Sequence, residues 1–318
     1  MTSNPRPIAV YYEHPEWFRP LFAELDRRRL PYVPLDASRH RYDATDGDGR
    51  QFGLVFNRMS PSAYLRGRGH SILYTLNFLA HLEHLGVRVV NGLSAFRIET
   101  SKALQLALLK SLGLPFPPAR VINHPDEAPA AADGLRYPVV VKANIGGSGA
   151  GIVRYDRPED LTAAVAAGRV ELGLDQTALV QEYIPARGGT ITRVEVLDGR
   201  FLYAIAVQTG TRFNLCPADI CQADEGTLVD ASCPVEAPKQ GLKVEGTTPP
   251  NEAIADVERI LARAGIEVGG VEYIVDDRDG RRYYYDINAL SNFVADAPRV
   301  VGFDPFPRLV DFLERERR

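Results

Sequence analysis

The sequence has few lysines, few cysteines and no long hydrophobic run. Only five lysines stand against thirty-two arginines, so a lysine at the end of a strand or beside a glycine-rich loop stands out from the background. No stretch reaches the roughly 20 apolar residues that a membrane-spanning helix needs. The N-terminal segment MTSNPRPIAVYY has no apolar run of the kind that a secretion signal carries. We therefore expect a cytoplasmic protein without a membrane partner.

An excess of positive charge is also missing. The formal net charge is -4 and the isoelectric point is about 5.9, so there is no basic field of the kind that attracts nucleic acid. The three cysteines, Cys216, Cys221 and Cys233, are odd in number and form no C-x-x-C pair, which favours reduced structural thiols over a zinc site. A small-molecule or peptidic partner is the remaining expectation, and no nucleic acid is expected.

The first ninety residues alternate short apolar runs with amphipathic segments, the pattern of a small α/β domain. We assign this domain to residues 1–93. Strands are expected at 8–13, 30–35, 52–57 and 87–90, and helices at 18–25 and 71–85.

The remaining chain has the pattern of an α+β unit in two parts, 94–177 and 178–318. From Ser94 we expect one long helix that includes ETSKALQLALLKSLGL and ends at Gly113. Residues 209–250 have the composition of a long loop. Strands are expected at 138–143, 152–155, 178–184, 191–197 and 200–208, helices at 158–168, at 251–264 and from 305, and a hairpin at 270–288.

The segment PVVVKANIGGSGAGIVRY combines a strand, a lysine and a loop almost without side chains. Its glycines allow backbone N–H groups to approach a polyphosphate, and Lys142 supplies a compact positive charge. The pattern is not the GxxxxGK[ST] phosphate loop, and a strand rather than a helix follows it. The alternative interpretation is a flexible hairpin loop with an incidental lysine. The loop residues considered are Gly146, Gly147, Ser148 and Gly149.

The hairpin VEYIVDDRDGRRYYYDIN predicts a cluster of oxygen ligands. Strand alternation places Asp286 and Asn288 on one face, about 7 Å apart, and Tyr285 and Ile287 on the other. A three-residue turn at 278–280 with a left-handed glycine would put Glu272 opposite Asp286, whereas a two-residue turn would not. Such ligands suit Mg²⁺ that is shared with phosphates. The alternative is a set of solvated acids at strand ends.

Two arginines are candidates for stabilising a transferred phosphoryl group. Arg193 lies on the strand TITRVEV, and Arg212 follows the next strand, which pairs with it if Asp198-Gly199 forms a hairpin turn. Guanidinium groups supply fixed positive charge where negative charge develops in the transition state. Either residue alone would ordinarily be a surface arginine.

Taken in order, these segments resemble the ATP-grasp superfamily, above all the branch of ribosomal-protein glutamate ligases, glutathione synthetases and lysine-biosynthesis carrier ligases. The resemblance spans Asn91 to the C-terminus and implies an α/β domain before the grasp, followed by a grasp fold of two subdomains. The matching strings are SK at 101–102, GLPFPP at 113–118, PVVVKANIGGSGAG at 138–151, LVQEYI at 179–184, TITRVEV at 190–196, GGVEY at 269–273 and YDIN at 285–288.

The resemblance implies ATP and Mg²⁺ as cofactors, two ions being expected and Mn²⁺ an alternative. Lys102 and Lys142 would contact ATP phosphates, and Arg193, Arg212 and Asn288 would be catalytic. Glu272, Asp286 and Asn288 would hold the metal. The backbone of Gln181, Glu182, Tyr183 and Ile184 would bind the adenine edge.

The sequence also departs from the family's pattern. No acidic residue for the ribose follows the expected adenine segment, and Ile191 stands where an acid commonly precedes the arginine. Asp286 replaces a glutamate that is one methylene longer. After Asn288 the family tends to have Pro-Gly, whereas this chain has Ala-Leu-Ser-Asn, so the substrates are expected to differ from those of well-known members.

Substrate-binding residues are expected in loops near the site. Arg58 and Tyr64, which follow a strand, and Ser291 and Asn292 are candidates, with Arg58 the first choice for a substrate carboxylate. A solvated basic loop is the alternative for the first two. Asn214 and Asp219 would border the acceptor or fold into a local cap.

The function expected from these features is ligation of a carboxylic acid to an amine through an acyl phosphate, with release of ADP and phosphate. Amino acids, other small carboxylic acids or a peptide would be the substrates, and a dimer or tetramer is expected from the resemblance. The rival interpretations are a carboxylate-thiol ligase or small-molecule kinase, and a MgATP-binding regulatory protein without turnover.

Overall fold

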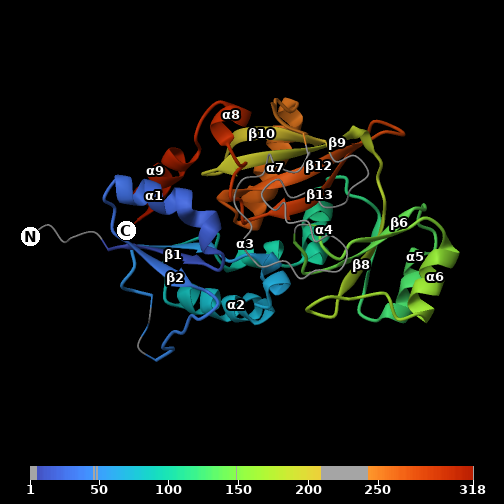
Figure 1. Cartoon of the computed structure of the whole chain (residues 1–318), viewed down its shortest axis with the longest axis horizontal. Coiled ribbons are helices and arrows are strands. Elements are labelled where there is room, and N and C mark those ends of the chain that lie inside the picture. Colours follow the sequence, from blue (N-terminus) through green and yellow to red (C-terminus); the bar gives the residue numbers. More distant parts are fainter. Residues whose placement is uncertain (1–5, 46, 48, 148, 209–242, 318) are drawn as a thin grey trace, which may run out of the picture.

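The computed structural model describes residues 6–45, 47, 49–147, 149–208 and 243–317. Three β-sheets follow one another along the long axis, and the N- and C-terminal regions lie together at one end (Figure 1). Ser148, Arg212, Asn214, Asp219 and the three cysteines, which carried predictions, lie outside the described residues.

The N-terminal part is a parallel four-stranded sheet in the order β2-β1-β3-β4. One face packs against α1 and α9 through Leu21 and Phe312, and the other packs against α2 through Phe78 and Leu79. A sheet covered on both faces explains the nearly continuous apolar runs in its strands. The elements are β1 (Ile8–Tyr12), η1 (Pro15–Phe18), α1 (Arg19–Arg27), β2 (Tyr32–Asp36), β3 (Leu54–Arg58), η2 (Pro61–Arg66), α2 (Gly69–His84) and β4 (Val89–Val90).

The middle part is a small antiparallel sheet in the order β5-β8-β6-β7. One face is covered by α5 and α6, whose alanines and leucine pack on the valines of β6. The elements are β5 (Ala119–Ile122), η3 (Pro125–Glu127), α5 (Ala128–Ala132), β6 (Val139–Ala143), β7 (Val153–Tyr155), α6 (Pro158–Ala166) and β8 (Ala178–Glu182).

The C-terminal part is a five-stranded antiparallel sheet in the order β11-β10-β9-β12-β13. Val194 and Val196 of β9 face α7, α3 and α4, whereas Ile191 and Leu197 face the core shared with the N-terminal sheet. The elements are α3 (Leu93–Glu99), α4 (Lys102–Ser111), β9 (Ala186–Leu197), β10 (Arg200–Gln208), β11 (Lys243–Thr247), α7 (Asn251–Ala264), β12 (Val268–Asp276), β13 (Arg282–Asn288), α8 (Ala297–Val301) and α9 (Phe306–Glu316).

Most predicted elements are present, and the Asp198-Gly199 turn joins β9 to β10 with both residues at positive φ. The single helix predicted from Ser94 to Gly113 is wrong, because the chain breaks into α3 and α4 at Thr100 and Ser101. Ser101 has an extended backbone, and its hydroxyl accepts a hydrogen bond from the Leu104 N–H, so it starts a new helix as an N-cap.

The sheet pairing also bears on the predicted domain boundary at 177/178. β8 pairs with β5 and β6 and therefore belongs to the middle sheet, so the chain passes from the middle sheet to the C-terminal sheet after Glu182. Conversely, α3 and α4, expected in the first grasp subdomain, pack on the C-terminal sheet. The extents of the three domains otherwise remain a prediction.

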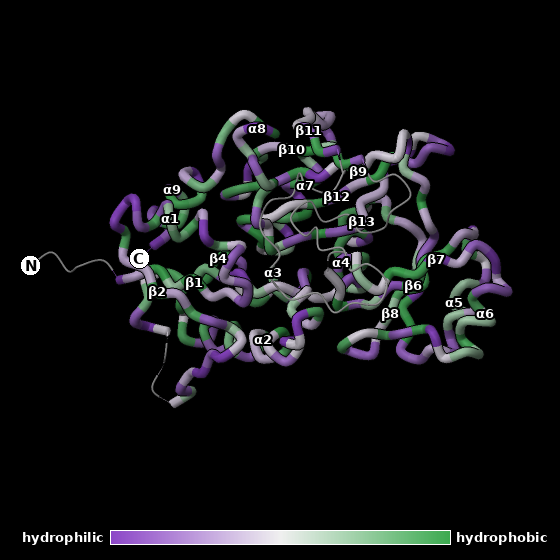
Figure 2. Tube along the Cα trace, viewed as in Figure 1, coloured by the Kyte–Doolittle hydropathy of each residue, from purple (hydrophilic) through white to green (hydrophobic). Residues whose placement is uncertain are grey.

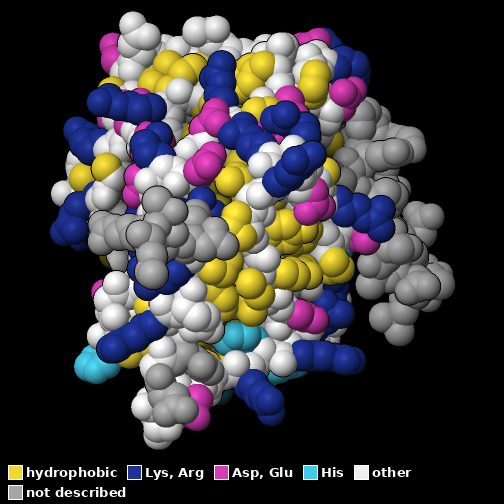
Figure 3. Space-filling model, turned by 90° about the vertical axis from the view of Figure 1, so that its left-hand side faces the viewer, with side chains coloured by type: hydrophobic (Ala, Val, Ile, Leu, Met, Phe, Trp, Pro, Cys, Tyr) yellow, Lys and Arg dark blue, Asp and Glu magenta, His cyan; other side chains and the backbone are white. Residues whose placement is uncertain are grey.

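Apolar residues lie along the strands in the interior, and polar residues along the outer loops (Figure 2). On the face shown in Figure 3, basic and acidic side chains are interspersed around a central group of apolar ones. No helix in the described part of the chain combines the length and apolarity needed to cross a membrane.

Candidate active site

A cleft lies between the C-terminal sheet and the glycine-rich segment that follows β6. Two lysines, one arginine, two carboxylates, an amide and a phenol converge on it from α4, β6, β9, β12 and β13. Its lining consists of Lys102, Lys142, Ala143, Gly146, Gly147, Gly149, Ala150, Ile152, Arg193, Glu272, Tyr285, Asp286 and Asn288.

β12 brings the acidic side chains and the arginine together, because it lies between β9 and β13. Glu272 is paired with Arg193 on one side and with Asp286 on the other. The predicted pairing of Glu272 with Asp286 is therefore confirmed. The turn of the hairpin differs from the expected one. The Asp276 N–H donates to the Arg281 carbonyl, so the turn has four residues rather than three. A bulge between the two strands restores the register.

The bulge corrects the predicted orientation of Tyr285. Regular alternation would place its side chain on the face opposite Asp286, but the pairing moves from Glu272–Asp286 to Tyr273–Tyr284 and leaves Tyr285 as the extra residue. Its ring therefore lines the cleft, and its hydroxyl donates to Glu272 Oε2 over 2.6 Å. Burial raises the pKa of the Tyr285 phenol well above its usual value, so the hydroxyl keeps its proton.

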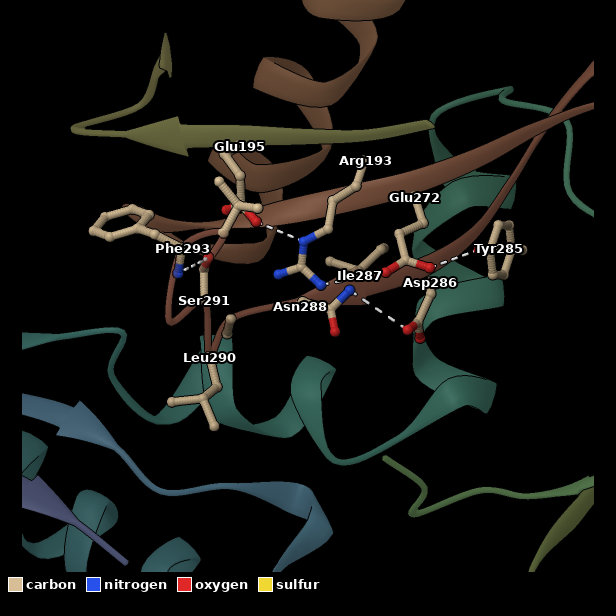
Figure 4. A network of polar contacts seen from close by, with 12 residues as sticks. Arg193, Glu195, Glu272, Tyr285, Asp286, Ile287, Asn288, Leu290, Ser291 and Phe293 are labelled. Atoms are coloured by element: carbon tan, nitrogen blue, oxygen red, sulfur yellow. Dashed lines mark hydrogen bonds and ion pairs between the residues drawn. The ribbon is translucent and has the colours of Figure 1, made fainter. Parts of the chain in front are cut away.

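Arg193 is held between two buried carboxylates on neighbouring positions of the sheet (Figure 4). Its Nε lies 2.5 Å from Glu195 Oε1, and its Nη1 lies 3.2 Å from Glu272 Oε1. Glu195 fits there because Gly270 opposite has no Cβ; an added Cβ would lie 2.9 Å from the Glu195 carboxylate carbon. Sequence reasoning missed Glu195, although its position two residues after Arg193 on one strand puts both on the same face.

Lys102 forms an ion pair with a predicted metal ligand. Its Nζ lies 2.6 Å from Asp286 Oδ1. Burial by itself would raise the pKa of Asp286, but the charges of Lys102, Lys142 and Arg193 outweigh it and hold that pKa below its usual value. Burial raises the pKa of Glu272, and the nearby negative charge of Asp286 raises it further.

Asn144 ties the two lysine-bearing elements together. Its Oδ1 accepts from the Ser101 hydroxyl and from the Ala103 N–H, over 3.1 and 2.9 Å, and its carbonyl accepts from the Lys102 N–H. These contacts fix the start of α4 against the end of β6, two residues after Lys142. Sequence reasoning missed this amide, and the cap-forming Ser101 was the signal that could have indicated it.

Lys142 has a different environment from Lys102. Its side chain is 6% exposed, and no described residue forms an ion pair or hydrogen bond with its ammonium group. Burial, together with the positive charge of Lys102, lowers the pKa of Lys142 to about 7. A buried cation without a partner is costly, so this position favours an anionic ligand.

The glycine-rich segment passes close to the N-terminal domain. A Cβ on Gly147 would lie 2.7 Å from Ser62 Cβ of η2, whereas a Cβ on Gly146 would make ordinary contacts at 3.5 Å. Gly147 is therefore needed for the close approach of the two backbones. Gly149 takes a positive φ of 71°.

The predicted adenine segment lies beside the lysine strand, because Gln181 of β8 is paired with Val140 of β6. The backbone N–H groups of Glu182 and Tyr183 donate to Pro118 and Pro138, while no described residue accepts from that of Ile184. These residues are not part of the lining of the cleft described above. Adenine binding here remains a prediction.

Arg58, the first choice for a substrate carboxylate, holds the backbone of the loop after Asn288 instead. Its side chain is 2% exposed, and its guanidinium donates to the carbonyls of Ala289 and Ser291. Glu99 also holds this loop, because its carboxylate accepts hydrogen bonds from the N–H groups of Ala289 and Leu290. This geometry does not favour contact between Arg58 and a substrate.

The other substrate candidates differ in their surroundings. Ser291 is 3% exposed, and its hydroxyl accepts from the Phe293 N–H. Asn292 has a buried Oδ1 atom that forms no hydrogen bond with any described residue. Tyr64 is half-buried in η2, and burial raises the pKa of its phenol despite the nearby charge of Lys102. Asn292 thus differs from the other candidates in having a polar atom whose hydrogen-bonding capacity is not used by the described residues.

The donor set fits a cation that is shared with phosphates. Glu272 and Asp286 are adjacent carboxylates, and the Asn288 amide nitrogen donates to Asp286 Oδ2 over 3.4 Å. No described residue donates to the Asn288 amide oxygen, which can therefore face a cation. Within the described ranges no group of three or more His, Cys, Asp or Glu residues could form a metal site on its own. Mg²⁺ needs few protein ligands when phosphate and water oxygens complete its shell.

Comparisons with known proteins agree with this geometry. Residues 99–221 match the RimK-like ATP-grasp domain. A probable alpha-L-glutamate ligase of Pseudomonas fluorescens (strain SBW25) is 31% identical over 136 residues, which are 42% of this chain and 44% of that protein. A D-alanine–D-alanine ligase of Alkalilimnicola ehrlichii is 26% identical over 293 residues, 90% of this chain and 84% of that one. The chain thus spans less than half of the first of these relatives.

Among solved structures, the ATP-grasp ligase PsnB complexed with a minimal precursor superposes with a TM-score of 0.66 at 19% identity, covering 98% of this chain and 99% of that one. This likeness concerns the fold and extends over the whole molecule. The predicted resemblance to ATP-grasp proteins is confirmed by the fold and by the domain match. The chain has the ATP-grasp fold, and its residues 99–221 are similar to the RimK-like ATP-grasp domain.

Proposed function

We propose that the protein is an ATP-dependent ligase that joins a carboxylic acid to an amine through an acyl phosphate. The observation that carries the proposal is the convergence of Lys102, Lys142 and Arg193 with Glu272 and Asp286 in one cleft beside a glycine-rich segment. Phosphoryl transfer requires fixed cations around the transferred group and anionic ligands for Mg²⁺, and both are present. The relatives named as ligases support the same reaction class.

The two lysines are proposed to hold the phosphates of ATP. Lys142 would gain the anionic partner that it lacks among the described residues, and Asn144 would keep Lys102 beside it. Glu272, Asp286 and Asn288 would hold Mg²⁺, and the ion would neutralise negative charge on the phosphate oxygens of ATP. The ion pair between Lys102 and Asp286 would then open, which frees the lysine for phosphate and the carboxylate for the metal.

Arg193 is proposed to stabilise the transferred phosphoryl group and the acyl phosphate. Its two carboxylate partners fix the guanidinium plane, so little reorganisation is needed during the reaction. Arg212 is proposed to act in the same way as Arg193, and Ser148 is proposed to bind ATP with the glycine-rich segment; both lie outside the described residues.

The chemistry balances in two steps. An oxygen of the substrate carboxylate attacks the γ-phosphorus, the bond from that phosphorus to the bridging oxygen breaks, and ADP leaves. The amine nitrogen then attacks the acyl carbon, the bond to the phosphate oxygen breaks, and phosphate leaves as the nitrogen loses a proton. Closure of the glycine-rich segment is proposed to keep water from the acyl phosphate.

The substrates are proposed to be amino acids or other small carboxylic acids, with a peptide as the alternative because PsnB was solved with its precursor. Binding of a second Mg²⁺, use of Mn²⁺ and assembly as a dimer or tetramer are further proposals. A cytoplasmic location, where MgATP would be supplied, is also proposed.

Hydroxylamine trapping tests the proposal. The protein is incubated with MgATP, pools of amino acids and other carboxylic acids, and hydroxylamine, and ADP and hydroxamates are quantified. We expect hydroxamate that depends on one acid, and amide when its amine partner is added.

The matched variants for this assay are Lys142→Met and Lys110→Met, which remove a cleft lysine and an exposed lysine of α4. Only the first should abolish the signal. ADP formation without hydroxamate would favour a kinase, thioester products a carboxylate-thiol ligase, and MgATP binding without turnover a regulatory protein.

A further inference from the structure

The bulge in β13 turns Tyr285 into the cleft, where it contacts Glu272. The two-step reaction proposed above gives this tyrosine no role. Tyr285 is the extra residue between Asp286 and Tyr284 in the pairing with β12. The shift costs the strand one regular backbone pair. In return it brings a phenol into contact with a predicted metal ligand, as Figure 4 shows.

Both oxygens of Glu272 are already engaged. Oε2 accepts from the Tyr285 hydroxyl over 2.6 Å, and Oε1 faces Nη1 of Arg193 at 3.2 Å. The side chain is almost fully buried, so water does not compete strongly for these contacts. The carboxylate plane is thus fixed from both ends, by a neutral donor on one oxygen and a cation on the other.

A carboxylate held in this way has limited freedom to chelate. Each oxygen retains a lone pair, but rotation of the group to present both oxygens to one cation would break the bond to Tyr285 or the contact with Arg193. Glu272 therefore offers a single oxygen at a defined position rather than a flexible chelating pair.

Divalent cations differ in how they use such ligands. Mg²⁺ requires a compact, nearly ideal octahedral shell, whereas Ca²⁺ takes six to eight oxygens and often binds a carboxylate through both oxygens. We propose that Tyr285 is a positioning residue that holds Glu272 as a single-oxygen ligand and thereby favours Mg²⁺ over Ca²⁺ in the nucleotide complex. This inference rests on the proposed MgATP site.

The test measures metal binding rather than turnover. Mn²⁺ is titrated into the full-length protein with a non-hydrolysable ATP analogue and followed by electron paramagnetic resonance, and Mg²⁺ and Ca²⁺ are added as competitors. In Tyr285→Phe, Mg²⁺ affinity is expected to fall about 10-fold, the effect typical of losing a group that orients a metal ligand. Ca²⁺ affinity should change less than about twofold, so the Mg²⁺/Ca²⁺ preference drops.

Tyr283→Phe is the matched control, because it removes a hydroxyl from the same strand outside the cleft. Binding of the analogue without metal and the thermal unfolding midpoint show whether Tyr285→Phe keeps its fold. As a second measurement, the same substitution in a Glu272→Gln background should leave the Mg²⁺/Ca²⁺ preference unchanged, since the positioned carboxylate is gone.

The outcomes separate the two proposals. An unchanged Mg²⁺/Ca²⁺ preference in a folded Tyr285→Phe variant overturns the role of Tyr285 and leaves the ligase function standing. Equal losses for both cations mean that the hydroxyl contributes to stability of the site but not to selection, and this also overturns the proposal. If the wild-type protein binds neither Mn²⁺ nor the analogue, the proposed MgATP site is itself wrong.

Discussion

The two walls of the cleft differ in how their charges are paired. On the wall formed by β9, β12 and β13, Arg193 lies between Glu195 and Glu272, and Glu272 also accepts from Tyr285. On the wall formed by β6 and the glycine-rich segment, the Lys142 ammonium has no partner among the described residues. One wall is organised before any ligand binds, and the other has an unsatisfied charge that a ligand can satisfy.

Removing the arginine should damage the paired wall most. Arg193→Met leaves two buried carboxylates without their cation, and the free energy of unfolding is expected to fall by about 3–5 kcal/mol. Urea denaturation measures this loss. Arg200→Met on the exposed end of β10 is the control and should change the free energy by less than about 0.5 kcal/mol. A loss at Arg193 as small as the control's would show that the two ion pairs are not stabilising.

The corresponding substitution on the other wall should affect the free energy of unfolding differently. Lys142→Met replaces a buried unpaired cation with an apolar side chain of similar length, so the free energy of unfolding should not decrease. Nucleotide affinity should nevertheless fall by about 10²-fold, because a phosphate loses its cation. Urea denaturation and isothermal titration calorimetry on one preparation test both statements. A destabilised variant would mean that the lysine has a stabilising partner in the apo protein.

The close approach of the glycine-rich segment to η2 offers a milder perturbation of the unpaired wall. Gly147→Ala introduces a Cβ 2.7 Å from Ser62 Cβ, so the segment must move away, at a cost of about 1–3 kcal/mol in nucleotide binding. Gly146→Ala, whose new contacts would be ordinary, is the matched control. Nucleotide titrations on both variants give the comparison, and equal affinities would contradict it.

The smallest expected effect is a change in protonation. Because the Lys142 pKa is lowered to about 7, this lysine is partly neutral in the free protein at and above neutral pH. Bound phosphates raise that pKa again, so nucleotide binding should take up a fraction of a proton between about pH 7 and 8.5, and affinity should fall as pH rises. Calorimetry in buffers of different ionisation enthalpy measures the uptake, which Lys142→Met should abolish.

The lowered pKa of Lys142 also makes the free energy of unfolding depend on pH. A lysine whose pKa is lower in the folded than in the unfolded protein binds fewer protons in the folded state above pH 7. Its contribution therefore makes the protein more stable as pH rises from about 7 toward the ordinary lysine range. Urea midpoints of the wild type and Lys142→Met across this range would separate this contribution from those of other groups.

Periodicity and turn chemistry predicted most of the fold and the positions of the charged cleft residues. The pairing of Glu272 with Asp286 was predicted from a three-residue turn, but a four-residue turn and the bulge at Tyr285 offset each other. No pattern in the strand YYYDIN indicates which tyrosine is the extra residue. The orientation of Tyr285 thus depends on packing that a single strand does not reveal.

Long-range contacts explain the other differences. Arg58 stands at the end of β3, where ligand-binding arginines are often found, yet it is buried because the loop carbonyls of Ala289 and Ser291 accept hydrogen bonds from it. Asn144 acts through partners on α4, and Glu195 fits beside Arg193 because Gly270 of the neighbouring strand leaves room for it. Such roles depend on where elements meet, which local patterns do not specify.

The hydrogen bonds that Arg58 and Glu99 form with the loop after Asn288 have a consequence for how this cleft can change over evolution. The contacts reach the main chain of Ala289, Leu290 and Ser291, not their side chains. A loop held by its main chain keeps its course when its side chains are exchanged. We therefore expect position 292, a predicted substrate contact, to be where substrate preference can diversify, or be redesigned, with least disturbance to the predicted metal ligands Asp286 and Asn288.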